Sequence, residues 1–299
     1  MIDYELLLFD RIEIIKTTIQ KYGEDKFYMS FSGGKDSTLL HKLLDLAIPN
    51  NNIPRVFINT GLEYNAIVEF VTALTKEDKR IVIVSPKIPV KKMLEEHGYP
   101  FKSKDFSRKV FIYQRNGKLL YGLQKWLQYT TARNSCPNCL RYMFTEENKI
   151  KISDKCCLIR KEKPLEDWSK ENNKSIAMIS ILGDEHGRRN EYGKFNGGCF
   201  ITRGKVSHFY PLKKVDMNFE NWFFEKYNVQ LCKLYYPPFN FKRTGCKGCP
   251  FDINIQKTLD TMEELMPIER QQAEAIWKPV YEEYRRLGYR LKRKEDEDD

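Results

Sequence analysis

The stretch FYMSFSGGKDSTLLHKLL, residues 27–44, joins a short apolar run to a second apolar pattern through a polar turn. The run KFYMSF predicts a buried strand, and TLLHKLLDLA places its leucines on one face of a helix. A turn that leaves a strand and enters a helix points backbone N–H groups, and the positive end of the helix dipole, toward the strand's carboxyl end. The sequence therefore predicts a phosphate-binding turn at residues 32–37.

The side chains of this turn suit a phosphate. Gly33 and Gly34 let the main chain approach an anion closely, Ser32 and Ser37 offer hydroxyl donors, and Lys35 adds a full positive charge. A plain connecting turn is the structural alternative.

The neighbouring Asp36 suits a metal-bridging role, for which Mg²⁺ is the expected ion, or a helix cap. The Walker A pattern does not fit, because no earlier glycine stands at the required offset, and the Rossmann glycine pattern also fails.

Strands and helices alternate along much of the chain. This order predicts an α/β fold with a doubly wound, mostly parallel sheet. The expected helices cover residues 3–22, 38–47 and 64–75, and the expected strands residues 26–31, 55–61, 80–86 and 174–182. We expect a nucleotide-binding domain over residues 1–217, with an irregular, cysteine-rich insertion at about 99–170, and a cysteine-containing helical region over residues 218–299.

The hexapeptide at residues 32–37 resembles the pyrophosphate loop (PP-loop) of the adenine-nucleotide α-hydrolase superfamily. VFINTGLEY (56–64) and SILGDEHGRRN (180–190) narrow the resemblance to the phosphoadenosine phosphosulfate (PAPS) reductase family and its DNA-phosphorothioation relatives, with Asn59 in place of the family's Asp. The resemblance implies a nucleotide site at Ser32, Gly33, Gly34, Lys35, Asp36, Ser37, Thr60 and Gly61. It implies catalytic roles for Lys35, Asp36, Glu185, Arg188 and Arg189.

Cysteine spacing points to a metal. Cys156-Cys157, followed far downstream by Cys246-x-x-Cys249, resembles the arrangement that holds a [4Fe–4S] cluster in adenylylsulfate (APS) reductases. Thiolates from two loops suit such a cluster, and nearby basic residues are expected to favour the deprotonated thiols.

A further pair, Cys136-x-x-Cys139, leaves alternatives open. With another cysteine pair it could hold Zn²⁺ or a second metal, although adjacent cysteines are awkward for a structural zinc. It could also be a redox or sulfur-carrying pair, or be passive core.

Two reactions fit these features. In the preferred one, an ATP-dependent sulfurtransferase adenylates an acceptor, releases pyrophosphate and transfers sulfur from a donor protein. In the alternative, APS or PAPS is reduced and sulfite is released; that reaction needs a mobile nucleophilic cysteine, and no cysteine follows Cys249. A non-catalytic nucleotide-sensing module is the second alternative.

Composition limits the partners. The chain has 51 Lys and Arg against 41 Asp and Glu, a formal net charge of +10, but the basic residues are dispersed along it. Nucleic acid is therefore one candidate acceptor, bound by phosphate contacts and stacking on the aromatic-rich insertion. No apolar run is long enough to span a membrane and the N-terminus does not resemble a signal peptide, so we expect a cytoplasmic protein, with homo-oligomerisation left open.

Overall fold

The computed structural model describes residues 3–128, 136–183, 199–203 and 206–293. The chain divides into two compact units whose segments alternate along the sequence. The first unit comprises Met1–Asn59, Glu63–Ser85 and Lys163–Thr244, and the second comprises Thr60–Leu62, Pro86–Glu162 and Gly245–Asp299. These units do not follow the single division at residue 217 that the sequence predicts.

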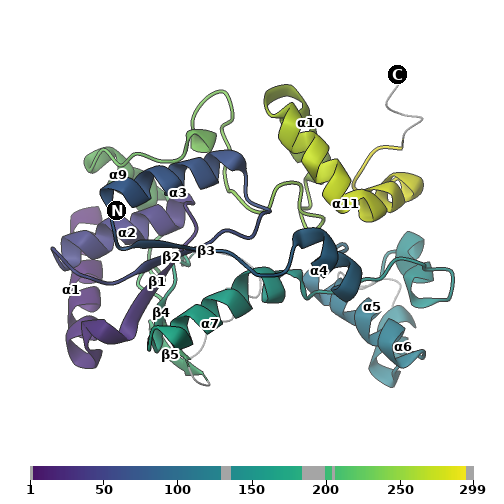
Figure 1. The fold of residues 1–299 in the computed structure, drawn as a ribbon, viewed down its shortest axis with the longest axis horizontal. Coiled ribbons are helices and arrows are strands. Elements are labelled where there is room, and N and C mark those ends of the chain that lie inside the picture. The colour runs from purple at the N-terminus through teal and green to yellow at the C-terminus, as the bar shows by residue number, and fades with distance from the viewer. Residues whose placement is uncertain (1–2, 129–135, 184–198, 204–205, 294–299) are drawn as a thin grey trace. The chain divides into compact units, whose positions relative to one another are not determined.

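The first unit is built on a six-stranded sheet with the strand order β3-β2-β1-β4-β6-β5 (Figure 1). All of its strand pairs are parallel except β5 with β6. The strands are β1 (Phe27–Phe31), β2 (Arg55–Ile58), β3 (Ile81–Val84), β4 (Ile176–Met178), β5 (Phe200–Arg203) and β6 (Val206–Phe209). The predicted α/β fold with a mostly parallel sheet is confirmed, although β4 is shorter than the predicted strand at 174–182.

Helices flank this sheet (Figure 1). On one face, Trp168 of α7 packs against Tyr28 of β1. On the other face lie α2 and α3 (Figure 1), and the leucines of α2 are buried as their helical spacing predicts. The helices are α1 (Tyr4–Tyr22), α2 (Lys35–Ala47), α3 (Asn65–Glu77), α7 (Lys163–Glu171) and α9 (Met217–Lys226).

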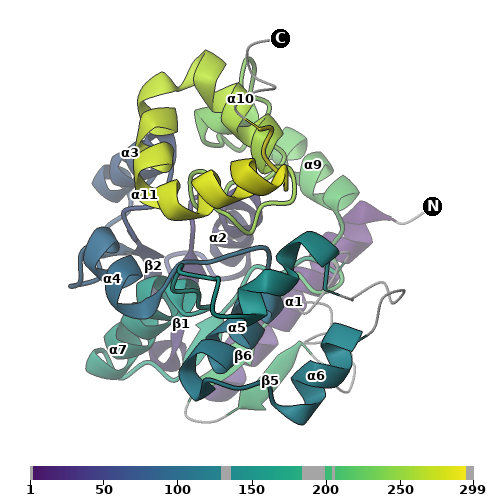
Figure 2. The same ribbon diagram turned by 90° about the vertical axis from the view of Figure 1, so that its right-hand side faces the viewer.

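The second unit is helical in its described part (Figure 2). It contains α4 (Val90–His97), α5 (Lys104–Asn116), α6 (Tyr121–Gln128), η2 (Asn138–Phe144), η3 (Leu158–Glu162), α10 (Ile255–Leu265) and α11 (Pro267–Leu287). Its aromatic core includes Phe101, Phe106 and Phe144.

The prediction of an irregular insertion over residues 99–170 is wrong for α5 and α6. Ser103 caps α5 by accepting a hydrogen bond from the N–H of Phe106 at 3.2 Å, and Phe106 and Val110 are buried at helical spacing. The pattern is hard to see in the sequence because basic and aromatic residues occupy the exposed face. No helix in the described residues has both the length and the apolar character needed to cross a bilayer.

Candidate functional site

The turn between β1 and α2 has the backbone geometry of a close-approach loop. Gly33 has φ +70°, a conformation that other residues rarely adopt. A Cβ at this position would lie 2.7 Å from Cγ2 of Val71. Glycine is therefore required here by both conformation and space.

Hydroxyl groups hold the turn in shape. Ser37 is buried, and its Oγ lies 3.0 Å from Oγ of Ser32 and donates to the carbonyl of Gly34 at 2.9 Å. The same Oγ accepts from the N–H of Ser32 at 3.2 Å. Hydrogen bonds of Ser32 and Ser37 thus stabilise the conformation of the turn itself.

Lys35 begins α2 and lies beside a buried carboxylate. Its Nζ is 3.5 Å from Oε2 of Glu220 on α9. Glu220 is only 1% exposed, and its Oε1 has no hydrogen-bond partner among the described residues. Burial and the neighbouring charge of Asp36 raise the pKa of Glu220 to about 7, and the charge of Lys35 opposes this shift.

Three further side chains line the turn from residues 235–244. The hydroxyl of Tyr235 accepts from the N–H of Lys35 at 3.2 Å and lies 2.7 Å from Oγ1 of Thr244. Arg243 has its Nη2 3.9 Å from Oδ2 of Asp36. Backbone N–H groups, a lysine, an arginine and hydroxyl groups therefore converge on one turn, which is a set of donors suited to an anion with several oxygens.

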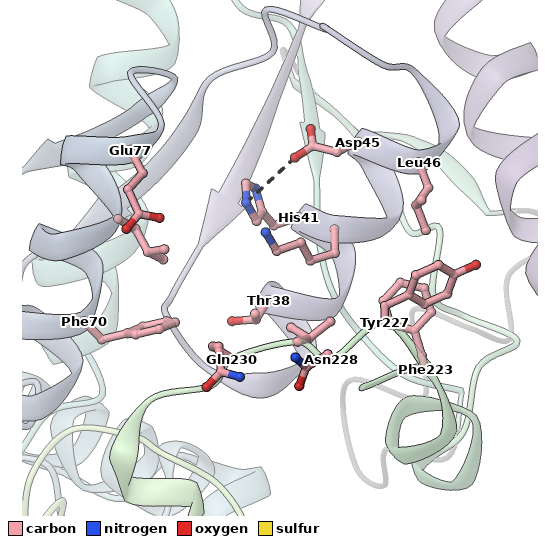
Figure 3. Close-up of a pocket in the computed structure, with 13 residues that line it drawn as sticks. Thr38, His41, Asp45, Leu46, Phe70, Glu77, Phe223, Tyr227, Asn228 and Gln230 are labelled. Atoms are coloured by element: carbon pink, nitrogen blue, oxygen red, sulfur yellow. Dashed lines mark ion pairs between the residues drawn. The ribbon is translucent and has the colours of Figure 1, made fainter. Parts of the chain in front are cut away.

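A separate cavity of about 440 Å³ lies along α2 in the same unit (Figure 3). Thr38, His41 and Asp45 line it from α2, Phe70 lines it from α3, and Tyr227 follows α9. Residues 32–37 do not line it.

One wall of this cavity is an ion cluster rather than an open metal site. His41, Asp45 and Asp78 have ligand atoms within 4.8 Å of one another. Arg55 and Arg80 already neutralise the carboxylates: Arg55 lies 2.6 Å and Arg80 2.9 Å from Asp45. Burial and the charge of Arg55 lower the pKa of His41 to about 4, so its neutral ring accepts from Nε of Arg55.

The four cysteines of the predicted cluster lie in the second unit. Cys156 and Cys157 immediately precede η3, and Cys246 and Cys249 lie in the loop before α10. The pKa of Cys156 is raised by burial first and then by the charges of Cys157 and Cys246, so the two pairs lie close enough to interact. Burial likewise raises the pKa of Cys249, followed by the charge of Cys246.

The sulfurs of these cysteines are not gathered around a single point as a zinc ion with four thiolates would require. Zinc with four thiolates places the sulfurs about 3.8 Å apart, from Zn–S bonds of ~2.3 Å in a tetrahedron. Among the described residues, no three cysteine sulfurs lie within 4.8 Å of one another. As expected, Arg160 and Lys161 lower the pKa of Cys156, but burial raises it by more, so its pKa is raised overall. Binding of a metal would therefore release protons.

Helix α11 fixes the loop that carries Cys246 and Cys249. Nε1 of Trp277 donates to the carbonyl of Lys247 at 3.0 Å, and the hydroxyl of Tyr284 donates to the carbonyl of Pro250 at 2.9 Å. Tyr281 donates to the carbonyl of Gly248, which has φ +58°. Three buried donors from one helix thus hold three carbonyls of the cysteine loop.

Both cysteine pairs are tied to the segment Thr60–Leu62. Arg160, three residues after Cys157, is buried and donates to the carbonyls of Thr60 and Ile88. The N–H of Lys247 donates to the carbonyl of Leu62 at 2.6 Å. The structure therefore links the cysteine pairs to the Thr60-Gly61 segment through hydrogen bonds to its backbone.

The two cysteines of the third pair, Cys136 and Cys139, differ in their exposure to solvent. Cys136 is buried and Cys139 is exposed. Burial raises the pKa of Cys136 to about 11, against the opposing charges of Arg141 and Lys102. Cys136 is thus a thiol at neutral pH and a poor nucleophile.

The outcome for the predicted residues is mixed. The structure gathers Ser32, Gly33, Gly34, Lys35, Asp36 and Ser37 in one turn of the first unit, and places Thr60 and Gly61 in the second unit. The predicted catalytic residues Glu185, Arg188 and Arg189 lie outside the described residues. Sequence reasoning missed Glu220, Tyr235, Arg243 and Thr244, and no local signal marks any of them.

Comparison with solved structures yields similar folds at low sequence identity. A PAPS reductase from Candida auris in complex with phosphate has 12% identity and a TM-score of 0.45, with 79% of this chain and 93% of that chain covered. A U34-tRNA thiolase from Methanococcus maripaludis with its [4Fe–4S] cluster has 17% identity and a TM-score of 0.42, with 93% and 80% covered. An NH₃-dependent NAD synthetase from Campylobacter jejuni has 14% identity and a TM-score of 0.42, with 94% and 96% covered.

Comparison of sequences is more specific. No curated protein matches the chain. Residues 26–122, which include the whole turn from Ser32 to Ser37, match the model of the phosphoadenosine phosphosulfate reductase domain. This match covers about a third of the chain and places the turn at 32–37, the PP-loop, within a region similar to the phosphoadenosine phosphosulfate reductase domain.

Proposed function

We propose that this protein is an ATP-dependent sulfurtransferase that adenylates an acceptor and then exchanges the adenylate for sulfur. The observation that carries the proposal is the PP-loop: Gly33 at φ +70°, the start of α2 and the ammonium of Lys35 together form a seat for a polyphosphate.

The chemistry balances with ATP alone as the activating reagent. An acceptor oxygen attacks the α-phosphorus, the bond between that phosphorus and the bridging oxygen breaks, and pyrophosphate leaves with the electron pair. Hydrosulfide, sulfur already at the sulfide level and delivered by a donor, then attacks the activated carbon or phosphorus; the bond from that atom to the AMP oxygen breaks, and AMP leaves with the electron pair, so no oxidant or reductant is needed. Lys35, Arg243 and the backbone N–H groups would stabilise the charge that develops on the departing pyrophosphate.

A [4Fe–4S] cluster is part of this proposal, with Cys156, Cys157, Cys246 and Cys249 as its ligands. Such a cluster supplies a redox-active group whose potential depends on its surroundings. The protein contributes a buried site, the three donors of α11, and Arg160 and Lys247 as links to residues 60–62.

The match to the phosphoadenosine phosphosulfate reductase domain also supports a second candidate function, that of a sulfonucleotide reductase. Such an enzyme needs a thiolate that attacks the sulfur of APS or PAPS. Cys136 has its pKa raised to about 11, and burial also raises the pKa of Cys156 and of Cys249. The shift at Cys136 disfavours it as that nucleophile, whereas the exposed Cys139 stays a candidate for the role.

Calorimetric binding of ATP, APS and PAPS to anaerobically purified protein tests the proposal, together with pyrophosphate release from ATP. We expect ATP to bind most tightly, and Lys35→Ala to weaken its binding about tenfold while Lys42→Ala on the same helix does not. Preference for APS or PAPS with sulfite release would establish the reductase instead. Tight ATP binding without turnover for any tested acceptor, oligonucleotides included, would favour the nucleotide sensor.

A further inference from the structure

One face of α5 carries a line of basic side chains. Lys104, Arg108 and Arg115 are separated by four and then seven residues, so they lie on one side of the helix. All three are exposed, whereas Phe106 and Val110 on the opposite side are buried. We call Lys104, Arg108 and Arg115 the basic stripe; at 1.5 Å per residue it is about 16 Å long.

The charge of this region is concentrated. Residues 104–128 contain six basic side chains and one acidic side chain, so they carry +5 of the formal net charge of +10. Asp105 pairs with Lys109, and Glu162 lies 3.7 Å from Lys104. Arg108 and Arg115 pair with no carboxylate in the described part of the chain. Helical spacing therefore gathers charges that are dispersed in the sequence.

The stripe continues toward the cysteines. Beside it lies the half-buried ring of Phe111, with Cζ of Arg115 at 5.9 Å and Nζ of Lys155 at 4.4 Å from its centroid. Lys155 immediately precedes Cys156. A polyanion on the stripe would therefore pass close to the Cys156-Cys157 pair.

Helix α6 adds an aromatic surface. Trp126 packs against Phe106 at 6.2 Å between ring centroids, which places α6 next to the side of α5 opposite the basic stripe (Figures 1 and 2). Tyr121 is 71% exposed, and Nζ of Lys125 lies 4.7 Å from the centroid of its ring. An exposed ring next to a cation is a typical platform for an unpaired base.

We propose that the basic stripe and Tyr121 bind a single-stranded segment of nucleic acid, the acceptor of the sulfur transfer proposed above, on which this inference rests. Phosphates match the line of cations, and a base can stack on Tyr121. A membrane surface fits less well, because the apolar side of α5 is buried in the core and cannot enter lipid. An acidic peptide would use the cations but not the exposed ring.

Fluorescence anisotropy with labelled 20-nucleotide single-stranded RNA and DNA tests the proposal without ATP. For R108Q/R115Q we expect the slope of log affinity against log salt to fall by about 1.4, and affinity at 0.1 M salt to fall about 25-fold. The matched control K76Q/K79Q removes the same charge from exposed positions in the first unit and should change neither value. An equal loss of oligonucleotide affinity in both double variants would show that binding depends on the net charge of the protein, and would contradict a binding site at the basic stripe.

A second pair of variants separates stacking from charge. Tyr121→Ala should weaken oligonucleotide binding about tenfold without changing the salt slope, whereas Phe9→Ala, at another exposed aromatic position, should have no effect. Stripe-dependent binding to phosphatidylserine vesicles, with no oligonucleotide binding, would assign the stripe to a membrane and overturn the proposal. Stripe-dependent oligonucleotide binding without ATP turnover would support the nucleic-acid site but contradict the proposed sulfurtransferase reaction.

Discussion

Nζ of Lys35 in the PP-loop lies 3.5 Å from Oε2 of Glu220, a carboxylate that is only 1% exposed. A carboxyl group of α9 therefore lies next to the ammonium group of the PP-loop. Because Asp36 and Lys35 both act on Glu220, the titration of this carboxyl group is linked to the loop.

Glu220 should make folding stability depend on pH. Its pKa rises from 4.5 to about 7 on folding, so its protonated form stabilises the fold at low pH and this contribution is lost as the pH rises through 7. Between pH 5 and pH 8 the wild type should lose about 2 to 3 kcal/mol of unfolding free energy relative to Glu220→Gln, which cannot ionise. Urea denaturation at both pH values measures this difference.

Glu225→Gln on the same helix is the control, because Glu225 is exposed. Its pH dependence should match that of the wild type. A Glu220→Gln variant with the wild-type pH dependence would show that Glu220 keeps its ordinary pKa in the folded protein.

The PP-loop needs glycine at position 33 for steric reasons. In Gly33→Ala the new Cβ would lie 2.7 Å from Cγ2 of Val71 in a backbone with φ +70°. We expect a loss of about 2 to 4 kcal/mol of unfolding free energy, from the strained conformation and the clash together. Chemical denaturation measures the loss, and ATP titration measures the accompanying change in affinity.

Gly117 provides a matched control, because it has φ +65° and a Cβ added there would meet no atom within 4 Å. Gly117→Ala should lower the free energy of unfolding by only about 1 kcal/mol, because it strains the backbone conformation without causing a clash. Adding Val71→Ala to Gly33→Ala should recover ATP affinity if the clash displaces the loop. Equal losses at both glycines would contradict a steric requirement at Gly33.

The sequence predicts the PP-loop well because its determinants are local: one strand, two glycines and one helix within eighteen residues. Glu220 could not be predicted, because in NFENWFFEK it resembles any solvent carboxylate of an amphipathic helix. It is buried in the folded protein, where α9 packs against α2. The cysteine pairs could be grouped from their spacing, but the burial that raises the pKa values of Cys156 and Cys249 depends on packing between segments far apart along the chain.

The cysteine assignment predicts which residues hold iron. Cys246→Ser and Cys157→Ser should each lower the iron content and the visible absorbance of anaerobically prepared protein to a small fraction of the wild-type value, because each removes a thiolate ligand. Cys232→Ser is the control: it lies buried in the first unit, apart from both pairs in sequence. Unchanged iron in the first two variants would place the metal elsewhere, and zinc in place of iron would contradict a cluster.

The hydroxyl of Tyr281 should slow the loss of metal from the loop that carries Cys246 and Cys249. Tyr281→Phe removes the donor to the carbonyl of Gly248 and leaves that buried carbonyl unsatisfied, at a cost of about 1 to 3 kcal/mol. If the hydrogen bond stabilises the cysteine loop, the variant should lose its iron to a chelator several times faster than the wild type. Tyr289→Phe, at a less buried position just after α11, should lose iron at the wild-type rate. A Tyr281→Phe protein with lower thermal stability but unchanged iron loss would show that α11 stabilises the fold without controlling the metal site.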